Sequence, residues 1–455
     1  MDMAALSPLE IPGTEKKKIA VVGTGISGMA AAWLLSKQHD VTVFERDGRI
    51  GGHSNTVLAG SVPVDTGFIV YNEATYPNLT ALFAHLGVAT HESDMSFAVS
   101  LDGGRLEYSG SGLGGIAAQP ANLFKPRFWS MIYDIRRFYR EASADQDRLE
   151  QEPSLTLADY LKRHGYGDAF IEDHLLPMAS AIWSGPPEVL KTISAAAFIR
   201  FQKNHGLLEL WDRPAWRSVV GGSRAYIRKL TESYADRIRT GAGALRIVRT
   251  PDGVLVHAAD STVARFDAVV IAAHADQGLA MLDAPTAEER RLLGTFRYNS
   301  NRAVLHTDAT LMPRRKAAWA SWNYLGARGG NAGRDVTVTY WMNRLQQLKT
   351  ETQLFVTLNP DRPIREDAIL HVEDYEHPVF DADALRIQKQ IWSLQGRNRI
   401  WYCGAWFGAG FHEDGLQSGL AVAEELGGLK RPWSVADESG CIFLGPASVP
   451  TERAA

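Results

Sequence analysis

The sequence predicts an α/β fold in which an interrupted Rossmann-like domain is joined to a second, mixed α/β domain. Residues 18–45 read as strand, glycine-rich turn, helix and strand, which is the entry unit of a Rossmann-like domain. Strands of the same type recur within residues 244–272 and 399–402. The length of 455 residues suits two or three domains, since a domain averages about 150 residues.

The composition excludes several classes of protein. With 45% hydrophobic and 22% charged residues the chain is neither disordered nor fibrous. The net charge of −4 gives no global field for nucleic acid, so no nucleic-acid partner is expected. Cys403 and Cys441 are the only cysteines, which excludes a disulfide framework and indicates a reducing compartment. No apolar stretch reaches the roughly 20 residues of a spanning helix, and the N-terminus lacks a secretory pattern, so a cytoplasmic protein is expected.

The first unit of the chain is the most regular. Lys18–Val22 is a short, apolar, β-branched run that predicts a strand. From Ile26 onward, apolar residues recur at spacings of three and four, which predicts a helix. Val41–Glu45 predicts the second strand.

The middle of the chain alternates between helical and strand patterns. We expect a helix over 79–86, a hairpin over 101–108 and an amphipathic helix over 128–140. Residues 155–235 read as mostly helical, with breaks at 183–187 and 219–222. A β-rich region and a final helix follow, with strands expected over 244–249, 254–258, 268–272, 302–306, 317–324, 336–340, 354–358 and 399–402, and the helix over 416–426.

These elements predict two domains, one of them assembled from separated stretches. The Rossmann-like domain is expected to contain 17–75, 215–290 and 395–430. The second domain is expected to contain 76–214 and 291–394, leaving tails over 1–16 and 431–455.

A glycine fingerprint after the first strand predicts dinucleotide binding. Gly23 permits a tight turn, Gly25 lets the backbone approach a pyrophosphate, and Gly28 lets helix and strand pack closely. Ile26 and Ser27 lie at the helix N-terminus, where N–H groups face the phosphates. At the end of the second strand, the Glu45 carboxylate can accept hydrogen bonds from ribose hydroxyls and would repel a 2′-phosphate, which disfavours NADP.

The residues after Glu45 indicate which dinucleotide the protein binds. Arg49, Gly51, Gly52 and His53 follow it at the spacing of an E-x-x-x-R-x-G-G-R signature. This pattern resembles the superfamily of flavin amine oxidases, phytoene desaturases and protoporphyrinogen oxidases. The resemblance implies non-covalent FAD and the two-domain architecture of amine oxidases. His53 replaces the final arginine of the signature.

Two later parts of the chain resemble the same superfamily. Residues 219–224 and 244–274 are similar to the second part of its FAD domain. Residues 400–406 and 413–419 are similar to its closing motif, in which a helix N-terminus faces the N1/O2 edge of the flavin. Ala405 stands where an acid is usual and Asp414 where a glycine is usual. The resemblance assigns cofactor contacts to Gly23, Gly25, Ile26, Ser27, Gly28, Glu45, Arg46, Arg49, Gly51, Gly52, His53, Gly67, Phe68, Ile247, Val248, Gly404, Ala405, Glu413, Asp414, Gly415, Leu416 and Ser418.

A narrower resemblance rests on residues 66–72 and 408–415. They look like a bacterial branch of NAD/FAD-binding proteins associated with cyclopropane-fatty-acyl-synthase-like methyltransferases. One member type is similar to the flavin-dependent dehydrogenase of furan fatty acid biosynthesis. The resemblance implies a lipid or fatty-acyl substrate and a methyltransferase-like pathway partner.

His53 and His412 are the candidate catalytic residues, because both lie in flavin motifs and histidine titrates near neutrality. The alternative role for each is a hydrogen bond to flavin or backbone. Cys403 precedes the closing motif, but a buried structural thiol is the commoner role, so covalent flavin is not expected. No Cys/His cluster has zinc spacing, so no metal is expected.

Amine oxidation is disfavoured by the lysine pattern. Amine oxidases of the superfamily commonly carry a lysine in the substrate-domain sheet. Over residues 300–345 the only lysine is Lys316, within a polar turn. Five aromatic residues in the same region form either a cage or a core, of which the core is favoured; they are Trp319, Trp322, Tyr324, Tyr340 and Trp341.

Residues 122–140 combine aromatic and basic side chains. On a helix, one face carries Phe128, Met131 and Phe138, and arginines border it. This pattern favours a helix lying in a membrane interface with its aromatic face down, over an ordinary domain helix with a basic solvent face.

We therefore expect an FAD-dependent oxidoreductase that dehydrogenates a lipid-linked or free fatty acyl chain by hydride transfer to flavin N5. It is expected in the cytoplasm, at the inner face of the membrane. An amine oxidase and a fatty-acid double-bond isomerase are the alternatives within the same fold. A flavin-stabilised binding subunit of a lipid-modifying system is the non-enzymatic alternative.

Overall fold

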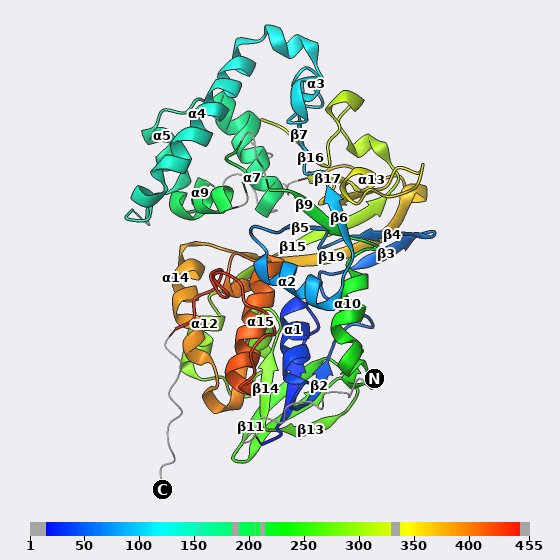
Figure 1. The fold of residues 1–455 in the computed structure, drawn as a ribbon. Coiled ribbons are helices and arrows are strands. Elements are labelled where there is room, and N and C mark those ends of the chain that lie inside the picture. The colour runs from blue at the N-terminus through cyan, green and yellow to red at the C-terminus, as the bar shows by residue number, and fades with distance from the viewer. Residues whose placement is uncertain are drawn as a thin grey trace, which may run out of the picture.

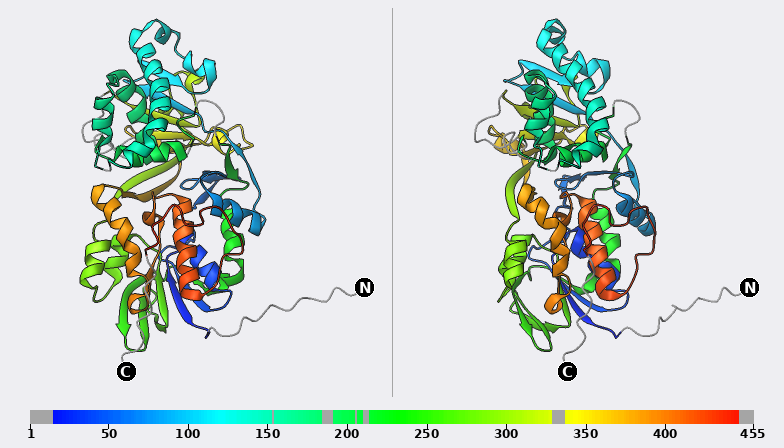
Figure 2. Two further views of the ribbon diagram at one scale, coloured as in Figure 1. Left: turned by 60° about the vertical axis from the view of Figure 1, so that its left-hand side comes forward. Right: turned by 90° about the vertical axis from the view of Figure 1, so that its left-hand side faces the viewer.

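The protein has two lobes, and the chain passes between them several times (Figures 1 and 2). The computed structural model describes residues 15–152, 154–183, 191–204, 206–209, 214–328 and 337–445. The lower lobe in Figure 1 combines the first, middle and last parts of the chain, whereas the upper lobe holds most of the cyan and yellow segments. The predicted interrupted α/β architecture is confirmed.

A five-stranded parallel sheet forms the centre of the lower lobe, which we call the Rossmann-like lobe. Its strand order is β10-β2-β1-β14-β20. Ile19 of β1 pairs with Val41 of β2 on one side and with Ala268 of β14 on the other. Strands from three distant parts of the sequence therefore lie side by side. They are β1 (Lys18–Val22), β2 (Asp40–Phe44), β10 (Ile238–Arg239), β14 (Ala268–Ile271) and β20 (Ile400–Tyr402).

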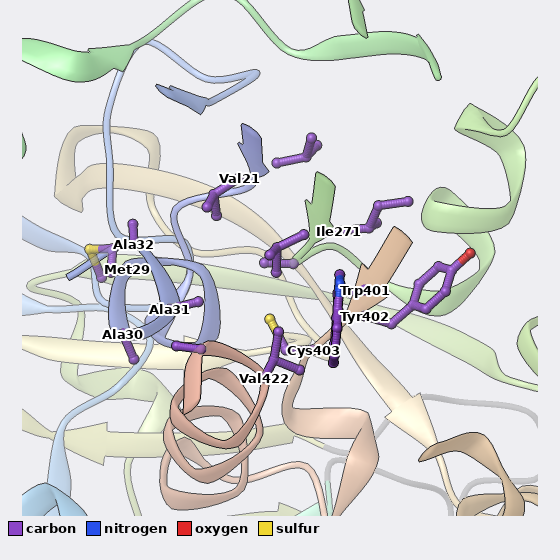
Figure 3. Close-up of a cluster of buried hydrophobic side chains, with 14 of the residues drawn as sticks. Val21, Met29, Ala30, Ala31, Ala32, Ile271, Trp401, Tyr402, Cys403 and Val422 are labelled. Atoms are coloured by element: carbon purple, nitrogen blue, oxygen red, sulfur yellow. The ribbon is translucent and has the colours of Figure 1, made fainter. Parts of the chain in front are cut away.

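Two helices pack against each other beside this sheet. Every residue of α1 (Ile26–Leu35) is buried, because α1 lies between the sheet and α15 (His412–Gly427). Figure 3 shows α1 alanines beside Val422 of α15 and Cys403 at the end of β20. At the contact, a Cβ on Gly419 would lie 2.1 Å from the carbonyl oxygen of Ser27. Only glycine permits the two backbones to approach this closely.

Further elements complete the Rossmann-like lobe. An antiparallel sheet of three strands stands beside the parallel one. Two of its strands fall where the sequence predicts them, over 244–249 and 254–258, whereas the strand Val263–Phe266 was not predicted. The elements are β11 (Ala244–Thr250), β12 (Gly253–Ala258), β13 (Val263–Phe266), α2 (Pro77–Leu86), α10 (Arg224–Thr231), α11 (Ala275–Met281), α12 (Ala287–Leu293) and α14 (Ala382–Ile391).

The second lobe is built on a seven-stranded mixed sheet with the order β19-β15-β18-β17-β16-β7-β8. The strands are β7 (Phe97–Leu101), β8 (Leu106–Ser109), β15 (Arg297–His306), β16 (Trp322–Gly326), β17 (Thr337–Trp341), β18 (Phe355–Leu358) and β19 (Ile369–Val379). Its helices are α3 (Gly112–Ile116), α4 (Pro126–Leu149), α5 (Leu157–Arg163), α6 (Asp168–Phe170), α7 (Leu176–Trp183), α9 (Ala195–Asn204) and α13 (Met342–Leu345).

Small sheets connect the two lobes. One is the hairpin of β3 (Thr56–Ala59) and β4 (Val62–Asp65). The other has the order β5-β9-β6, so that segments before and after the helices of the second lobe pair with each other. Its strands are β5 (Val70–Asn72), β6 (Thr90–Ser93) and β9 (Trp216–Val219).

Several predicted boundaries need correction. The strand expected over 317–324 begins only at Trp322, because residues 316–318 form a 3₁₀ turn and Trp322 is the first residue to join the ladder. The helix expected over 128–140 extends from Pro126 to Leu149. The final helix begins at His412, four residues earlier than expected. Position 336 and most of the predicted break at 183–187 lie outside the described residues.

The hydrophobic cores also divide the chain differently from the predicted domains. Leu79 and Leu82 of α2 are buried in the core of the Rossmann-like lobe, as is Ile387 of α14, although these segments were assigned to the second domain. Part of the predicted tail at 431–455 is packed: Trp433 stacks on Trp33 with ring centroids 5.7 Å apart, and Ile442 is buried. We assign α2 and α14 to the Rossmann-like lobe because their apolar side chains are buried in its core.

Among the described residues, the structure has no helix long and apolar enough to cross a membrane.

The α1–α15 contact generates a stability prediction. Gly419→Ala should lower the free energy of unfolding by about 2 kcal/mol or more, because the new Cβ overlaps backbone that cannot move alone. Gly48→Ala is the matched control, since its Cβ would meet nothing within 4 Å, and it should change stability by less than about 0.5 kcal/mol. Denaturant unfolding measures both, and equal effects of the two substitutions would contradict the packing argument.

Candidate functional site

The glycine-rich turn from β1 into α1 contains three glycines, of which one has free space at its Cβ position and two do not. A Cβ on Gly23, whose φ is +103°, would lie 2.4 Å from the carbonyl oxygen of Ala272. A Cβ on Gly28 would lie 2.1 Å from the carbonyl oxygen of Gly23. At Gly25, by contrast, nothing lies within 4 Å of the Cβ position. The turn therefore leaves free space at the helix N-terminus, where a phosphate group could approach backbone N–H groups.

The Glu45 carboxylate holds this turn in place. One of its oxygens accepts hydrogen bonds from the backbone N–H of Thr24, at 3.0 Å, and from the Thr24 hydroxyl. Its other oxygen accepts a bond of 2.9 Å from the N–H of Asp47. The Thr24 hydroxyl in turn accepts the N–H of Gly51 at 3.1 Å. The acid at the end of β2 therefore links the glycine turn to the second glycine motif. Arg46, another predicted contact, points into solvent beside Asp47.

The second glycine motif lies directly on the first. A Cβ on Gly52 would lie 3.1 Å from the Cα of Gly25. Arg49 donates to the carbonyl oxygen of Gly52 at 2.7 Å and pairs with Glu373 of β19 at 3.1 Å. Arg49 thus fixes the motif to the sheet of the second lobe.

The segment around Gly67 joins the same loop. The N–H of Phe68 donates to the carbonyl oxygen of His53 at 2.7 Å, and a Cβ on Gly67 would lie 2.2 Å from that oxygen. The Phe68 ring stacks on His412 with centroids 3.8 Å apart and planes within 11°. The structure therefore brings together predicted residues from the first and last parts of the chain.

His412 is a neutral histidine in an aromatic setting. One of its ring nitrogens shares a hydrogen bond of 2.7 Å with the Tyr226 hydroxyl, which in turn bonds Ser54 at 2.5 Å. Burial lowers the pKa of His412 to about 3. In this setting His412 is a neutral hydrogen-bonding partner at neutral pH.

His53 lies in a cluster of histidines that the motifs did not reveal. Its ring packs 4.8 Å from Tyr375 and 5.4 Å from His377, both on β19. Burial, followed by the neighbouring His377 and His274, holds the pKa of His53 well below its usual range. The Nε2 of His53 is buried and has no hydrogen-bond partner among the described residues. This nitrogen is therefore free to bond a bound molecule.

Tyr375, His377 and His274 are site residues that the sequence reasoning missed. His274 stacks on Tyr298 at 4.2 Å and contacts Glu376 at 3.2 Å. Tyr375 and His377 lie on β19, where alternate residues from 371 to 377 are less exposed than their neighbours. The sequence carries no matching signal, because Asp374 and Glu376 between them are polar as well.

The two acidic residues of the closing motif, Glu413 and Asp414, accept hydrogen bonds at helix N-termini. The Glu413 carboxylate accepts the backbone N–H groups of Asn78 and Leu79, at 3.0 and 2.9 Å, and so binds the N-terminus of α2. Asp414 caps α15 by accepting the N–H of Phe411 at 2.7 Å, and burial raises the pKa of Asp414 to about 7. The side chains of Glu413 and Asp414 are thus committed to helix termini, so any cofactor contact from these positions falls to the backbone.

The remaining closing-motif residues hold the turn after β20. The Ser418 hydroxyl accepts the N–H of Gly404 at 3.0 Å. A Cβ on Gly415 would lie 2.8 Å from the Ile26 side chain and 3.7 Å from the Cβ of Ala405. Leu416 is fully buried. The closing motif and the glycine turn therefore touch each other.

Ile247 and Val248 lie on β11. Ile247 is buried, its carbonyl oxygen accepts the N–H of Asp283 at 3.0 Å, and Val248 pairs with Leu255. The segment before β11 reaches Glu45, whose carbonyl oxygen accepts the N–H of Ala242 at 2.8 Å. A contact of Ile247 or Val248 with the cofactor stays a prediction.

The expectations for Cys403, Lys316 and the aromatic residues are confirmed. Cys403 is buried, and burial raises the pKa of its thiol to about 12. Lys316 is exposed in a 3₁₀ turn. The aromatic residues form packed edge-to-face pairs, with centroids 4.8 Å apart for Trp322 and Tyr340 and 5.4 Å apart for Trp319 and Trp341.

The expected membrane face of α4 is wrong. Phe128, Met131 and Phe138 are buried in the core of the second lobe, so this face contacts protein. Its apolar periodicity reflects packing against Tyr108 of β8 and against α6 and α9.

Within the described ranges, no three or more His, Cys, Asp or Glu side chains form a group that could hold a metal ion.

Comparison with known proteins identifies the family. The family model for flavin containing amine oxidoreductases matches residues 26–351, which is more than half of the chain. The chain is 39% identical to protoporphyrinogen oxidase 2 of Arabidopsis thaliana over 89 residues, which is 19% of this chain and 17% of that protein. It spans about half or less of the length of the curated relatives it matches.

Solved structures share the fold. A putrescine oxidase variant superposes with a TM-score of 0.65 at 14% identity, covering 90% of this chain and 98% of that one. A fatty acid isomerase from P. acnes that produces CLA superposes with a TM-score of 0.62 at 15% identity, covering 89% and 97%. The chain belongs to the flavin containing amine oxidoreductase family, and FAD is its cofactor. The site residues fit FAD, because Gly25 leaves room for a pyrophosphate at the N-terminus of α1.

Gly25 generates a binding prediction. Gly25→Ala should weaken FAD binding about tenfold or more, because its Cβ enters space that the fold leaves empty, while the free energy of unfolding of the apoprotein stays unchanged. The ratio of flavin to protein after purification, with an FAD titration of the apoprotein, measures the effect. Full flavin content in Gly25→Ala would contradict the placement of the pyrophosphate.

The setting of His412 generates a pH prediction. A histidine whose folded pKa lies below its unfolded value contributes stability above pH 6.5 that is lost as the pH falls towards 3. The apoprotein should therefore lose up to about 1.4 kcal/mol per pH unit from this group over that range, and His412→Gln should remove this loss. Denaturant unfolding of both proteins between pH 7 and 4 measures the difference. A difference that does not change with pH would contradict a neutral, buried His412.

Proposed function

We propose that this protein is an FAD-dependent dehydrogenase that introduces a double bond into a lipid-linked or free fatty acyl chain. Bound FAD supplies a hydride acceptor at N5. The substrate loses two C–H bonds and gains one C=C bond. One hydrogen leaves with its electron pair as a hydride from an allylic or methyl-branched carbon, and the other leaves as a proton to the protein.

The observation that carries the proposal is an uncharged, aromatic wall beside the flavin motifs. Phe411, at the start of the closing motif, stacks on Phe201 of α9 with centroids 5.0 Å apart. Phe201 packs 4.5 Å from Trp183 of α7. Because Phe411 precedes His412 in the chain, these contacts begin next to the Phe68–His412 stack and lead into the helical part of the second lobe. A hydrocarbon chain suits such a wall, because burying apolar surface is favourable and leaves no polar group unpaired.

The same wall disfavours an ammonium substrate. The pKa values of His53 and His412 are both lowered, so these residues offer neutral rings. Arg49, the fixed charge of the second glycine motif, is positive and already pairs with Glu373. A cationic amine would find no free carboxylate among these residues, so only the aromatic faces would compensate its desolvation.

His53 is the better placed proton acceptor. Its Nε2 is unpartnered among the described residues, whereas a ring nitrogen of His412 is occupied by Tyr226. His377 and Tyr375 pack against the His53 ring and hold its orientation. We assign proton removal to His53 and orientation of the reacting carbon to the stack of His412 and Phe68.

The proposal also covers the source of the acyl substrate and the place of the reaction in the cell. The solved fatty acid isomerase has the same fold, which supports a flavoprotein of this architecture accepting an acyl chain. A methyltransferase-like enzyme that methylates an unsaturated acyl chain would supply a methyl-branched substrate. We place the reaction in the cytoplasm, at the inner face of the membrane.

Anaerobic mixing tests the reaction class. A methyl-branched, monounsaturated fatty acid in detergent micelles should bleach the oxidised flavin of the purified holoprotein and yield a product with one more double bond. Putrescine, tested in parallel, should leave the flavin oxidised. Reduction by putrescine alone would replace the proposal with amine oxidation. A shifted double bond without net flavin reduction would indicate an isomerase, and no reaction with any acyl chain would favour a binding subunit.

Variants of the holoprotein test the proton acceptor within the same assay. His53→Gln should slow flavin reduction about 100-fold or more while FAD remains bound, because general-base catalysis contributes about 10²–10⁴. His371→Gln is a matched control on β19, the strand that carries Tyr375 and His377. The His371 ring already pairs with Glu373, so this variant should reduce flavin at the normal rate. Normal reduction in His53→Gln with bound FAD would rule out this base.

A further inference from the structure

The end of the second lobe carries a group of exposed apolar side chains. They come from three elements in sequence: α3, the 3₁₀ turn at Pro120–Phe124, and the first turns of α4. Figure 1 shows α3 and the start of α4 at the top of the molecule, far from the Rossmann-like lobe. We call this group the apolar tip, and its members are Leu113, Phe124, Trp129 and Tyr133.

The fold does not explain this exposure. Leu113 is 86% exposed and Phe124 is 87% exposed, so neither contributes to a core. The apolar face of α4 is already buried, because Phe128 and Met131 pack in the core of the second lobe. A single exposed leucine is ordinary, but several large apolar side chains gathered at one end mark a surface that contacts something else.

A basic border surrounds the apolar tip. Between residues 104 and 133 the only acid is Glu107, which is fully buried and bound by Arg315. The ammonium group of Lys125 reaches the carbonyl oxygen of Arg105, and α3 packs beside the turn that carries Lys316. The exposed members of the border are Arg105, Lys125, Arg136, Arg314 and Lys316. Arg127 is not counted, because it already pairs with Glu172 and Asp173.

We propose that the apolar tip docks the protein on the surface of an anionic phospholipid bilayer. Aromatic and leucine side chains enter the boundary between headgroups and acyl chains, and tryptophan and tyrosine favour that boundary. The surrounding Lys and Arg side chains meet the negative lipid headgroups. The side chains project from short elements at the end of a lobe, which suits a deformable bilayer better than a shaped protein groove.

The face of residues 122–140 that meets lipid is therefore the one that carries Trp129 and Tyr133, and not the buried face of Phe128 and Met131. This docking does not depend on the proposed reaction. Trp129 donates its indole N–H to the carbonyl oxygen of Leu123 at 2.8 Å, so the turn and α4 are held together as one unit. The contact needs no spanning helix. If the proposed reaction holds as well, docking places the protein beside its acyl substrate.

Vesicle co-sedimentation of the full-length holoprotein, without any substrate, tests the proposal. The protein should pellet with vesicles of phosphatidylcholine and phosphatidylglycerol, bind more weakly to phosphatidylcholine alone, and release as salt rises. The double variant L113S/F124S should bind these vesicles at least about tenfold more weakly than the wild type, because two exposed apolar anchors are removed. Both positions are solvent-exposed, so the flavin content and thermal midpoint should match the wild type.

The matched control is L245S/V263S, which removes two apolar side chains that are more than half exposed on the antiparallel sheet of the Rossmann-like lobe. It should bind vesicles like the wild type. Absence of wild-type binding, equal binding to neutral vesicles, or equal loss in both double variants would overturn the proposal. Because no substrate is present, these outcomes are independent of whether an acyl chain reduces the flavin.

Discussion

The structure depends on the close approach of three pieces of backbone around α1, which only glycine allows. Gly28 brings α1 against the glycine turn, and Gly419 brings α15 against the carbonyl oxygen of Ser27. The segments that supply these glycines are separated by almost the whole chain. Their contact places the closing motif beside the phosphate-binding turn, so that residues from both ends form one site.

Polar groups hold the Rossmann-like lobe together and join it to the second lobe. Within the Rossmann-like lobe, Glu413 of α15 accepts backbone N–H groups at the N-terminus of α2. Between the lobes, Arg49 links the second glycine motif to Glu373 in the other sheet. A buried acid paired with helix N–H groups is strongly held, because leaving it unpaired would cost several kcal/mol, of the order of 1–3 for each lost bond. The histidines between the lobes are neutral, and their neutrality makes the space beside the flavin motifs suited to an uncharged chain.

Local patterns in the sequence predict the Rossmann-like lobe well, because the glycine turn, Glu45 and the strand periods act over short distances. Tyr375 and His377 could not be placed this way, since they meet His53 only through the fold and belong to no motif. The apolar face of α4 was assigned to lipid because periodicity shows which face is apolar and not what covers it. Glu413 was expected near the flavin, and its binding of α2 depends on a partner more than 300 residues away.

Three separated stretches of one chain come together in the structure as a single site for FAD. Titration of the apoprotein with FAD, followed by calorimetry and by quenching of flavin fluorescence, tests whether they act as one site. We expect saturation at one FAD per chain, a raised unfolding midpoint, and no comparable binding of NADP. Failure to bind FAD, or stoichiometric binding of NADP in its place, would contradict this expectation.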